Sequence, residues 1–302
     1  MRTVVDVEHV YMNFQDEEVL HDVTFSFQEG KIYGIVGNNG SGKTVLMKCI
    51  CGFLRPTRGR IFVNYKEIGH DVDFPEDIGI IIETPGFLPN LTGYKNLEIL
   101  ASLRGKAGKE RIRESIKMTG LDPDLKKHVV KYSLGMRQRL GIAIALAGDP
   151  DFLVLDEPAN GLDPQGIIEM RELILKLNRE RQITVLISSH ILDELSRLAT
   201  HYGFIDRGHM IKEISAQELE AACRKCVRVE VTDTGVLSKV LDRMELEYEI
   251  LSDSQADIFA SVNVTALVLA LAEMNCEVLS MSIRDESLES YYVSLVGGGS
   301  YE

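Results

Sequence analysis

The chain opens with apolar residues that alternate with polar ones, which is the period-two pattern of strands with one buried face. On this pattern residues 4–10 and 23–27 are predicted to form antiparallel strands. Unbroken apolar runs typical of buried parallel strands follow at 32–36, 78–82, 152–155 and 183–187. Helical periodicity alternates with these runs, most clearly over residues 96–103, 109–119, 135–147 and 169–180. This alternation predicts an α/β fold.

The pattern changes after about residue 214. From there the periodicities predict the strand–helix–strand–strand–helix–strand order of a ferredoxin-like fold, followed by a last helix. Asn263 is expected to cap the second helix, because its side chain can accept hydrogen bonds from the first free N–H groups. We therefore predict two domains, residues 1–214 and a small α+β domain at 215–302.

Negative charge is concentrated in the second predicted domain. Residues 215–302 contain 6 basic and 16 acidic residues and hold −10 of the chain's formal net charge of −13. Such an acidic domain would repel negatively charged partners, which argues in particular against binding of nucleic acid. The five cysteines are scattered and odd in number, and the first residues lack the apolar stretch of a signal peptide. Both observations favour a reduced cytoplasmic setting.

A glycine-rich loop stands between the apolar run at 32–36 and a predicted helix that starts near Lys43. It matches the pattern G-x-x-x-x-G-K-[ST], in which backbone N–H groups turn toward phosphate oxygens and the helix N-terminus adds partial positive charge. Lys43 can bridge the β- and γ-phosphates, and the Thr44 hydroxyl can ligate Mg²⁺. The predicted nucleotide site comprises Gly37, Asn38, Asn39, Gly40, Ser41, Gly42, Lys43 and Thr44.

Two acidic residues, Asp156 and Glu157, directly follow the apolar run at 152–155. Parallel α/β sheets bind ligands at the C-terminal ends of their strands. Asp156 is expected to hold Mg²⁺, and Glu157 is expected to polarise or deprotonate a water aligned with the γ-phosphate.

Residues 132–139, Tyr-Ser-Leu-Gly-Met-Arg-Gln-Arg, resemble the signature motif of ATP-binding cassette (ABC) proteins, usually LSGGQ. Four further motifs follow this family in order and spacing: the phosphate loop, Asp-Glu-Pro at 156–158, Asn-Gly-Leu-Asp-Pro at 160–164 and Ser-Ser-His at 188–190. The resemblance covers about residues 1–214. It implies a P-loop NTPase fold, an ABC ATPase domain with a helical subdomain at about 84–147, that binds and hydrolyses ATP.

The resemblance also implies a head-to-tail dimer of two such subunits with two ATPs between them. Ser133 and Gly135 would cap the γ-phosphate bound by the opposite subunit, because a helix N-terminus offers N–H donors and a favourable dipole to an anion. Leu134 and Met136 depart from the usual signature, whereas Ser133 and Gly135 keep it.

Three more residues take their expected roles from the resemblance. His190 matches the switch histidine that contacts the γ-phosphate, and Asp163 matches the loop that communicates across the dimer. Phe14 falls where the family places an aromatic ring that stacks on adenine, and Tyr11 is the nearby alternative.

Glu83 follows the run at 78–82, where the family commonly has a glutamine that meets Mg²⁺ and the membrane partner. A carboxylate at this place would bind the metal more strongly but would add repulsion with phosphate. We expect Glu83 to be a metal contact and to alter coupling to the partner.

Residues 82–97 and 132–143, with the acidic C-terminal extension, are similar to the bacitracin and lantibiotic exporter branch of the family. No apolar run approaches the ~20 residues of a membrane-spanning helix, so a separate permease chain would form the pathway. The similarity implies an ATPase at the inner face of the cell membrane that powers export of a peptide antibiotic or a similar amphipathic compound, and with it antibiotic resistance.

Three alternatives stand beside the exporter. An importer ATPase remains open. A soluble ABC ATPase not coupled to a transporter usually has two cassettes or a long coiled coil, and neither is present here. A catalytically dead nucleotide sensor is disfavoured by intact Lys43, Asp156, Glu157 and His190.

Overall fold

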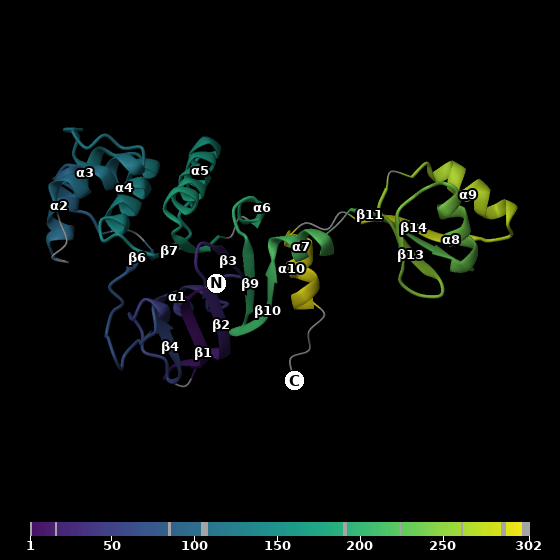
Figure 1. The fold of residues 1–302 in the computed structure, drawn as a ribbon, viewed down its shortest axis with the longest axis horizontal. Helices are drawn as coiled ribbons and strands as arrows, with labels where there is room; N and C mark the ends of the chain where they lie inside the picture. The colour runs from purple at the N-terminus through teal and green to yellow at the C-terminus, as the bar shows by residue number, and fades with distance from the viewer. Residues whose placement is uncertain are drawn as a thin grey trace. The chain divides into compact units, whose positions relative to one another are not determined.

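The computed structural model describes residues 2–15, 17–83, 86–103, 108–189, 192–223, 225–260, 262–284 and 288–297. Two compact units form: one from residues up to 216 with the described residues from 295 onward, the other from residues 217–294 (Figure 1). Within the described ranges, none of the helices has the length and apolar character needed to cross a bilayer.

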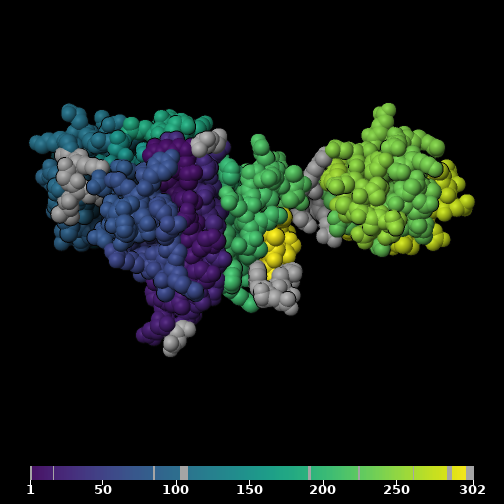
Figure 2. Space-filling view, turned by 60° about the horizontal axis from the view of Figure 1, so that its bottom comes forward, coloured from purple at the N-terminus to yellow at the C-terminus, as the bar shows by residue number. Residues whose placement is uncertain are grey.

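The N-terminal strands build an antiparallel sheet in the first unit. Strands β1 (Thr3–Phe14) and β2 (Glu17–Gln28) form a long hairpin, as the alternating pattern predicts. Strands β4 (Arg58–Val63) and β5 (Lys66–Glu67) extend the sheet in the order β2-β1-β4-β5. In Figure 2 the blue segment that contains β4 lies directly against the purple N-terminal strands.

A second, six-stranded sheet has the order β10-β9-β3-β8-β7-β6. All but β10 run parallel, which confirms the predicted parallel sheet. Its strands are β3 (Ile32–Val36), β6 (Ile78–Ile81), β7 (Phe152–Asp156), β8 (Thr184–Ser188), β9 (His201–Asp206) and β10 (His209–Ser215). Since β3, β7 and β8 are parallel neighbours, their C-terminal ends meet at one edge of the sheet.

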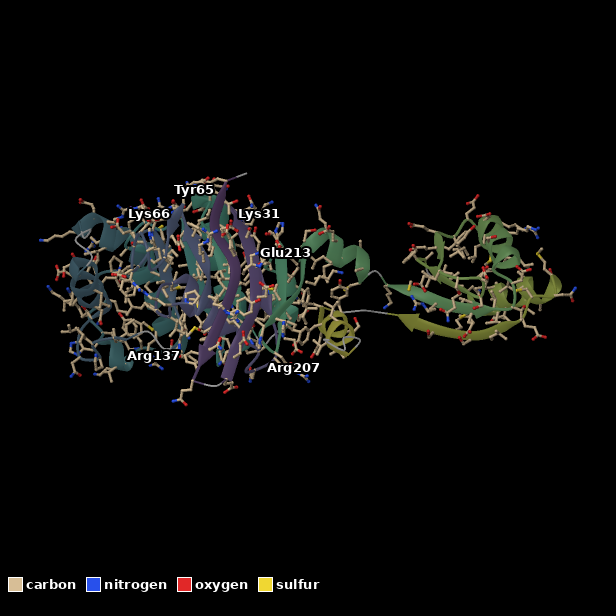
Figure 3. All side chains as sticks on the ribbon, turned by 90° about the horizontal axis from the view of Figure 1, so that it is seen from below. Lys31, Tyr65, Lys66, Arg137, Arg207 and Glu213 are labelled. Atoms are coloured by element: carbon tan, nitrogen blue, oxygen red, sulfur yellow. The ribbon has the colours of Figure 1, made fainter. Side chains whose placement is uncertain are left out.

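The β9–β10 hairpin was not predicted from the sequence. Arg207 and Gly208 form its turn at φ values of 45° and 81°, and Figure 3 labels Arg207. The Gly208 N–H donates to the Ser41 carbonyl at 3.0 Å, and the His21 N–H donates to the Gly208 carbonyl at 2.9 Å. The turn therefore ties strand β2 to the glycine-rich loop.

Aromatic rings fill the core of the first unit beneath helix α1 (Lys43–Ile50). Phe25, Phe27 and Tyr33 are fully buried and meet edge to face, and Phe27 meets Phe152 in the same way at 5.5 Å between ring centroids. Such pairs contribute beyond the area that they bury. Helices α5 (Pro164–Arg181) and α6 (Leu192–Ser196) follow β7 and β8 in the chain.

Three helices of the first unit pack around a separate apolar cluster. They are α2 (Gly93–Leu103), α3 (Lys109–Met118) and α4 (Leu134–Leu146), and a 3₁₀ turn at Val129–Lys131 precedes α4. Leu97, Ile112, Ile116 and Leu140 are completely or almost completely buried in this cluster. This arrangement gives α4 a support of its own.

The second unit contains the predicted ferredoxin-like order of elements. These are β11 (Cys226–Val231), α8 (Thr234–Arg243), β12 (Tyr248–Ile250), β13 (Gln255–Ile258), α9 (Val264–Glu273) and β14 (Val278–Arg284). The sheet order is β12-β13-β11-β14, and all its pairings are antiparallel. Helices α7 (Ala216–Ala222) and α10 (Leu288–Gly297) flank this set in the chain, and α7 was not predicted.

The core of the second unit lies between its sheet and its helices. Val229 and Val231 from β11 meet Leu237 from α8 and Leu267 from α9, and all four are fully buried. Asn263 caps α9 as predicted, since its Oδ1 accepts from the Ala266 N–H at 3.1 Å.

Candidate functional site

The glycine-rich loop joins β3 to α1 and needs its glycines for close contacts. A Cβ on Gly37 would come within 2.4 Å of the Ile205 carbonyl oxygen. Gly42 has φ +105°, and a Cβ there would come within 2.8 Å of Leu20 Cδ2. Gly40, at φ +80°, belongs to the exposed tip with Asn38 and Asn39. The backbone is therefore curled as an anion-binding loop requires.

Lys43 curls back over the loop. Its Nζ donates to the Gly37 and Asn38 carbonyls at 2.8 and 2.9 Å. Burial lowers the pKa of the Lys43 ammonium, and the Glu157 and Asp156 carboxylates oppose that shift. Such a buried cation is suited to a multiply charged anion, which would supply a close countercharge.

Ser41 adds a second sign of an anion site. The side chain is buried, and its Oγ has no hydrogen-bond partner within the described part of the chain. A buried hydroxyl without a partner is unfavourable, so a ligand oxygen would relieve it. The loop thus fits a phosphate group by both shape and donor supply.

Asp156 connects this loop to the strand ends. Its Oδ2 accepts from the Thr44 hydroxyl at 2.8 Å, and its Oδ1 accepts from the Ser188 hydroxyl at 2.5 Å. Asp156 and Ser188 stand directly opposite one another in the β7–β8 pairing. The parallel sheet therefore brings together residues separated by more than a hundred positions in the chain.

Glu157 is held in a left-handed conformation with φ 49°, which is uncommon for a residue with a side chain. Its N–H donates to Ser188 Oγ at 3.0 Å, and Asn160 Nδ2 donates to its Oε2 at 3.0 Å. These contacts fix both the backbone and the carboxylate. Strain of this kind recurs at functional sites.

Ser188 and Asn160 were not singled out in the sequence as functional side chains. Ser188 ends an apolar strand, and Asn160 lies in the segment that matches a family motif. Their positions in the sequence could therefore have marked both as candidate site residues. Their hydrogen bonds to the acidic pair depend on the pairing of β7 with β8 and on the turn after β7.

Pairing in the β1–β2 hairpin supports Phe14 rather than Tyr11 as the ring near the loop. Phe14 lies on the same face of β1 as Met12, which pairs with Leu20, the residue that packs on Gly42. Tyr11 lies on the other face, where the Arg58 guanidinium stacks 4.3 Å from its ring centroid. Phe14 is 43% exposed and therefore accessible to a ligand.

Glu83 has a left-handed backbone, with φ 61°, and its Oε1 accepts from Lys48 Nζ at 2.7 Å. Lys48 lies on α1, the helix that begins at the glycine-rich loop. Within this chain, the Glu83 carboxylate is therefore paired with Lys48, which lies one helical turn after Thr44 on α1.

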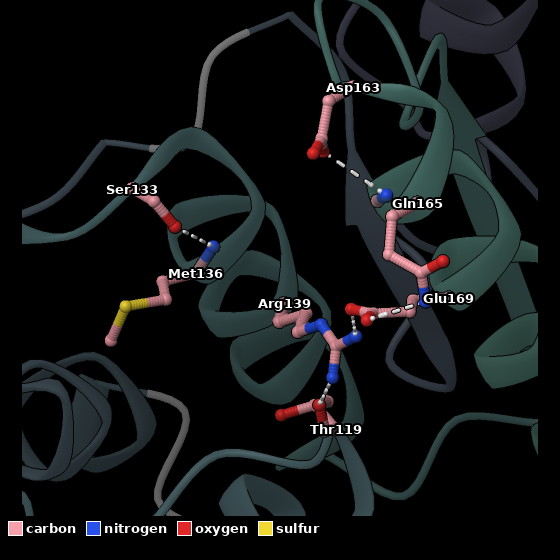
Figure 4. Close-up of polar contacts among 8 residues, drawn as sticks. Thr119, Ser133, Met136, Arg139, Asp163, Gln165 and Glu169 are labelled. Carbon is pink, nitrogen blue, oxygen red and sulfur yellow. Dashed lines mark hydrogen bonds and ion pairs between the residues drawn. The ribbon is translucent and has the colours of Figure 1, made fainter.

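Ser133 and Asp163 are the N-caps of α4 and α5 (Figure 4). Ser133 Oγ accepts from the Met136 N–H, and Asp163 Oδ1 accepts from the Gly166 N–H, both at 3.2 Å. Both residues and Gly135 line one open pocket of about 650 Å³. The predicted residues therefore form two groups, and His190 lies outside the described residues.

An apolar groove of about 730 Å³ is lined by residues of or next to β6, α2 and α4 and by the segments that follow α1 and precede β6. Phe53 and Phe74 lie in it with ring centroids 6.2 Å apart, and they are 52% and 60% exposed. Exposed rings of this size mark binding surfaces more often than isolated apolar residues do.

Comparisons with known proteins agree with this geometry. The family model described as ABC transporter matches residues 20–160. Bacitracin transport ATP-binding protein BcrA of Enterococcus faecalis is 38% identical over 309 residues, covering 99% of this chain and 98% of that protein. Lantibiotic transport ATP-binding protein SrtF of Streptococcus pyogenes is 38% identical over 211 residues, covering 70% of this chain and 90% of that protein.

Solved structures show the same fold. The structure of an ATP-binding subunit of an ABC transporter has a TM-score of 0.64 at 26% identity and covers 73% of this chain and 93% of that one. A dimeric ATP-binding cassette with ADP and Pi, in a post-hydrolysis state, has a TM-score of 0.62 at 24% identity over 70% of this chain and 98% of that one. The similarity to BcrA spans nearly the whole of both chains. The chain therefore belongs to the ABC transporter family, as one of its ATP-binding and ATP-hydrolysing subunits.

Proposed function

We propose that this chain is the motor of an exporter and that it binds MgATP on the glycine-rich loop, with the γ-phosphate toward Glu157. One observation carries the proposal. Lys43, Thr44, Asp156 and Glu157 come from two distant segments and meet at one edge of the parallel sheet, with the two carboxylates acting on the Lys43 ammonium.

Mg²⁺ would be held by the Thr44 hydroxyl and Asp156, whose Oγ1 and Oδ2 lie 2.8 Å apart. Oxygen ligands of this kind suit the ion, which takes its remaining ligands from phosphate and water. When bound, the ion would neutralise charge on the phosphates. Glu83 is proposed as a further contact with the ion, reached by release of the carboxylate from Lys48.

Glu157 is proposed as the general base for hydrolysis. Asn160 donates to its Oε2, and the left-handed backbone at Glu157 holds the carboxylate at the end of β7. His190 is proposed, from its place in the family motif, to contact the γ-phosphate. Phe14 is proposed to stack on the adenine ring, consistent with its face of β1.

The active form is proposed to be a head-to-tail dimer. Helix α4 has 13 residues, and its first turn is capped by Ser133 and carries Gly135, so N–H groups there can face an anion. In such a dimer Ser133 and Gly135 of one subunit would contact the γ-phosphate on the other, and Asp163 would lie at the junction.

The apolar groove is proposed to receive a helix from a separate permease chain, which would place this subunit at the inner face of the membrane. The exposed rings of Phe53 and Phe74 suit the apolar face of an amphipathic helix, and Glu76 in the same groove suits a basic residue beside that face. The residues 1–214 are proposed as the ATPase domain and 215–302 as an accessory domain.

The cargo is proposed to be a peptide antibiotic, so that export confers resistance. Support comes from BcrA, a bacitracin transport protein that matches this chain over 98% of its own length, including the acidic C-terminal region. Expression with the permease should raise the tolerance of a sensitive host to bacitracin-type peptides. Equal susceptibility with and without both chains would contradict the cargo assignment.

The motor assignment is tested by Glu157→Gln, which keeps the shape of the side chain and removes the base. Steady-state hydrolysis should fall by a factor of about 10² or more, and the chain should accumulate as an ATP-bound dimer in sedimentation. Glu172→Gln, an exposed charge removal on α5, is the matched control and should behave as wild type. Equal hydrolysis by wild type and Glu157→Gln would show that Glu157 is not the base.

The groove is tested by Phe74→Ser, which should lower the yield of permease that co-purifies from membranes. Tyr65→Ser, another exposed aromatic that lies outside the groove, is the control and should retain the permease. Equal recovery of the permease by the two variants would place the docking surface elsewhere.

A further inference from the structure

Leu134, which stands where the family usually has a glycine, lies against the loop that leads into α5. A Cβ on Gly161 would come 3.1 Å from Leu134 Cδ2, and Gly161 has φ +74°. The Leu134 side chain thus packs on bare backbone, and a Cβ on Gly135 would lie 3.7 Å from Cδ2 of the neighbouring Leu162. This contact fixes the first residue of α4 against the segment that ends at the Asp163 cap.

A second contact joins the same two helices farther along. The Arg139 guanidinium of α4 pairs with Oε2 of Glu169 on α5, while Gln165 donates to Oε1 of Glu169 at 3.1 Å (Figure 4). Both oxygens of the Glu169 carboxylate are therefore engaged. The Arg139 side chain is 22% exposed and that of Glu169 is 47% exposed, so water screens this pair less than an ion pair with both partners fully exposed.

Arg139 also holds the end of a third helix. Its Nη1 donates to the carbonyl of Thr119, the residue that ends α3, at 3.2 Å. A Cβ on the next residue, Gly120, would come within 2.7 Å of the same nitrogen, so glycine leaves room for the guanidinium. Arg139 thus links α3, α4 and α5.

We propose that Leu134 and Arg139 are positioning residues that clamp α4 to α5. The clamp, made of the Leu134–Gly161 and Arg139–Glu169 contacts, presents the Ser133 and Asp163 caps to the second subunit as one rigid face. This inference rests on the proposed head-to-tail dimer. A preset face lowers the ordering penalty of association, because α4 does not have to be immobilised when the partner's nucleotide arrives.

The clamp predicts a split between two measurements. Nucleotide binding by the single chain depends on Lys43, Thr44 and Asp156, which are not part of the clamp. Dimerisation depends on the α4 face. Loss of the clamp should therefore weaken ATP-dependent dimerisation and leave the affinity of the single chain for ATP unchanged.

The test uses the full chain in the Glu157→Gln background with MgATP. Glu169→Gln should raise the dimer dissociation constant about fivefold to tenfold, since both clamps of a dimer lose a charged hydrogen bond. Glu172→Gln, with the same charge change on the same helix, should match the parent. Arg139→Lys should weaken dimerisation less than Arg139→Ala, because lysine keeps the charge but not the guanidinium geometry. Thermal melting checks that each variant folds.

Each result decides between the proposals. Unchanged dimerisation of folded Glu169→Gln, or an equal loss of single-chain ATP affinity, overturns the clamp. A Glu157→Gln parent that stays monomeric with MgATP overturns the proposed dimer, and the clamp falls with it. A variant that does not fold is replaced by Leu134→Ala, which should weaken dimerisation without removing a charge.

Discussion

Asp156 shows how a single residue connects the parts of the nucleotide site. One carboxylate oxygen accepts from Thr44 on α1, and the other accepts from Ser188 on β8. Because Ser188 also accepts from the Glu157 N–H, a shift of one side chain is felt by all four residues. Such networks are worth more together than their separate bonds.

At this scale we predict that Glu83→Gln retains ATP binding and changes coupling to the permease. The carboxamide keeps the size of the side chain but loses the ion pair with Lys48 and the charge near the metal. ATP affinity should stay within about threefold of wild type, because the lost ion pair is solvent-exposed.

The measurement is ATP turnover with and without the permease in membranes. The ratio of the two rates should change in Glu83→Gln and not in Glu110→Gln, which removes an exposed charge on α3 outside the groove. An unaltered ratio in Glu83→Gln would mean that this carboxylate has no special role.

Sequence reasoning at this scale succeeded where spacing along the chain decides the contact. The residues of the glycine-rich loop are neighbours in sequence, so a loop between β3 and α1 could be predicted, but the hydrogen bonds from Lys43 to the Gly37 and Asn38 carbonyls could not. The Ser188 contacts and the Lys48–Glu83 pair could not, because they depend on which strands and helices become neighbours. The family resemblance placed Phe14 ahead of Tyr11, and the face of β1 on which Phe14 lies is consistent with that choice. The assigned chemical roles stay predictions.

Among the elements, the β9–β10 hairpin contains a pair of histidines next to the glycine-rich loop. His209 stacks on His21 of β2 at 4.4 Å between ring centroids. Burial, and then the charge of His21, lower the pKa of the His209 imidazole from its ordinary value of 6.5. The hairpin therefore resists protonation while it is folded.

We predict that this hairpin makes the fold less stable in acid. Below the ordinary pKa of 6.5 the unfolded chain binds more protons at this site than the folded chain, so stability falls as pH falls. His209→Phe retains a flat ring and removes the titration. Its melting temperature should decline less than that of wild type between about pH 7.5 and about pH 5.

His70 provides a control of opposite sign. A hydrogen bond from the His70 ring to the Asp71 carboxylate raises the pKa of the His70 imidazole, so its contribution to stability is present in acid and is lost as pH rises. His70→Gln should therefore steepen the decline in acid. Identical pH profiles for His209→Phe and wild type would contradict the hairpin prediction.

Helix α9 carries a cap prediction at the same scale. Asn263→Ala leaves the Ala266 N–H without its acceptor and should destabilise the second unit by about 1 kcal/mol. Thr265→Ala, an exposed change one residue into the helix, should have little effect. Urea unfolding followed by circular dichroism measures both, and equal midpoints would contradict the cap.

Elements with strong periodicity could be predicted, and weak ones could not. Strands β3 and β7 consist almost wholly of apolar residues and were predicted within a residue of their ends. β10 lies at the edge of its sheet, so its exposed residues break the apolar pattern. Its turn has Arg-Gly in place of the usual Asn-Gly or Asp-Gly, which removed the hairpin signal. The short α7 spans too few turns to show a period.

At the scale of the whole molecule, each of the two units has its own core. The buried residues of the second unit form their own cluster, and the site residues all belong to the first unit. The predicted boundary at residue 214 stays a prediction.

We predict that a chain ending at Ala216 folds and binds nucleotide. It lacks residues from 295 onward that group with the first unit, so a modest loss of stability is expected. MgATP should raise its melting temperature by about the same few degrees as in the full chain, since a ligand stabilises by its affinity alone. A truncated chain without a cooperative transition would show that the first unit depends on the second.

Helix α1 has a consequence for chemical labelling. Cys49 and Cys51 lie on or next to it and are fully buried, and burial raises the pKa of the Cys49 thiol to about 12 and that of Cys51 as well. Thiolates are the reactive form, so alkylation at neutral pH must await transient opening of this helix. Helix α1 begins with Lys43, which is expected to bind phosphate. The rate of iodoacetamide labelling should therefore report how often this helix opens, and bound nucleotide should lower that rate.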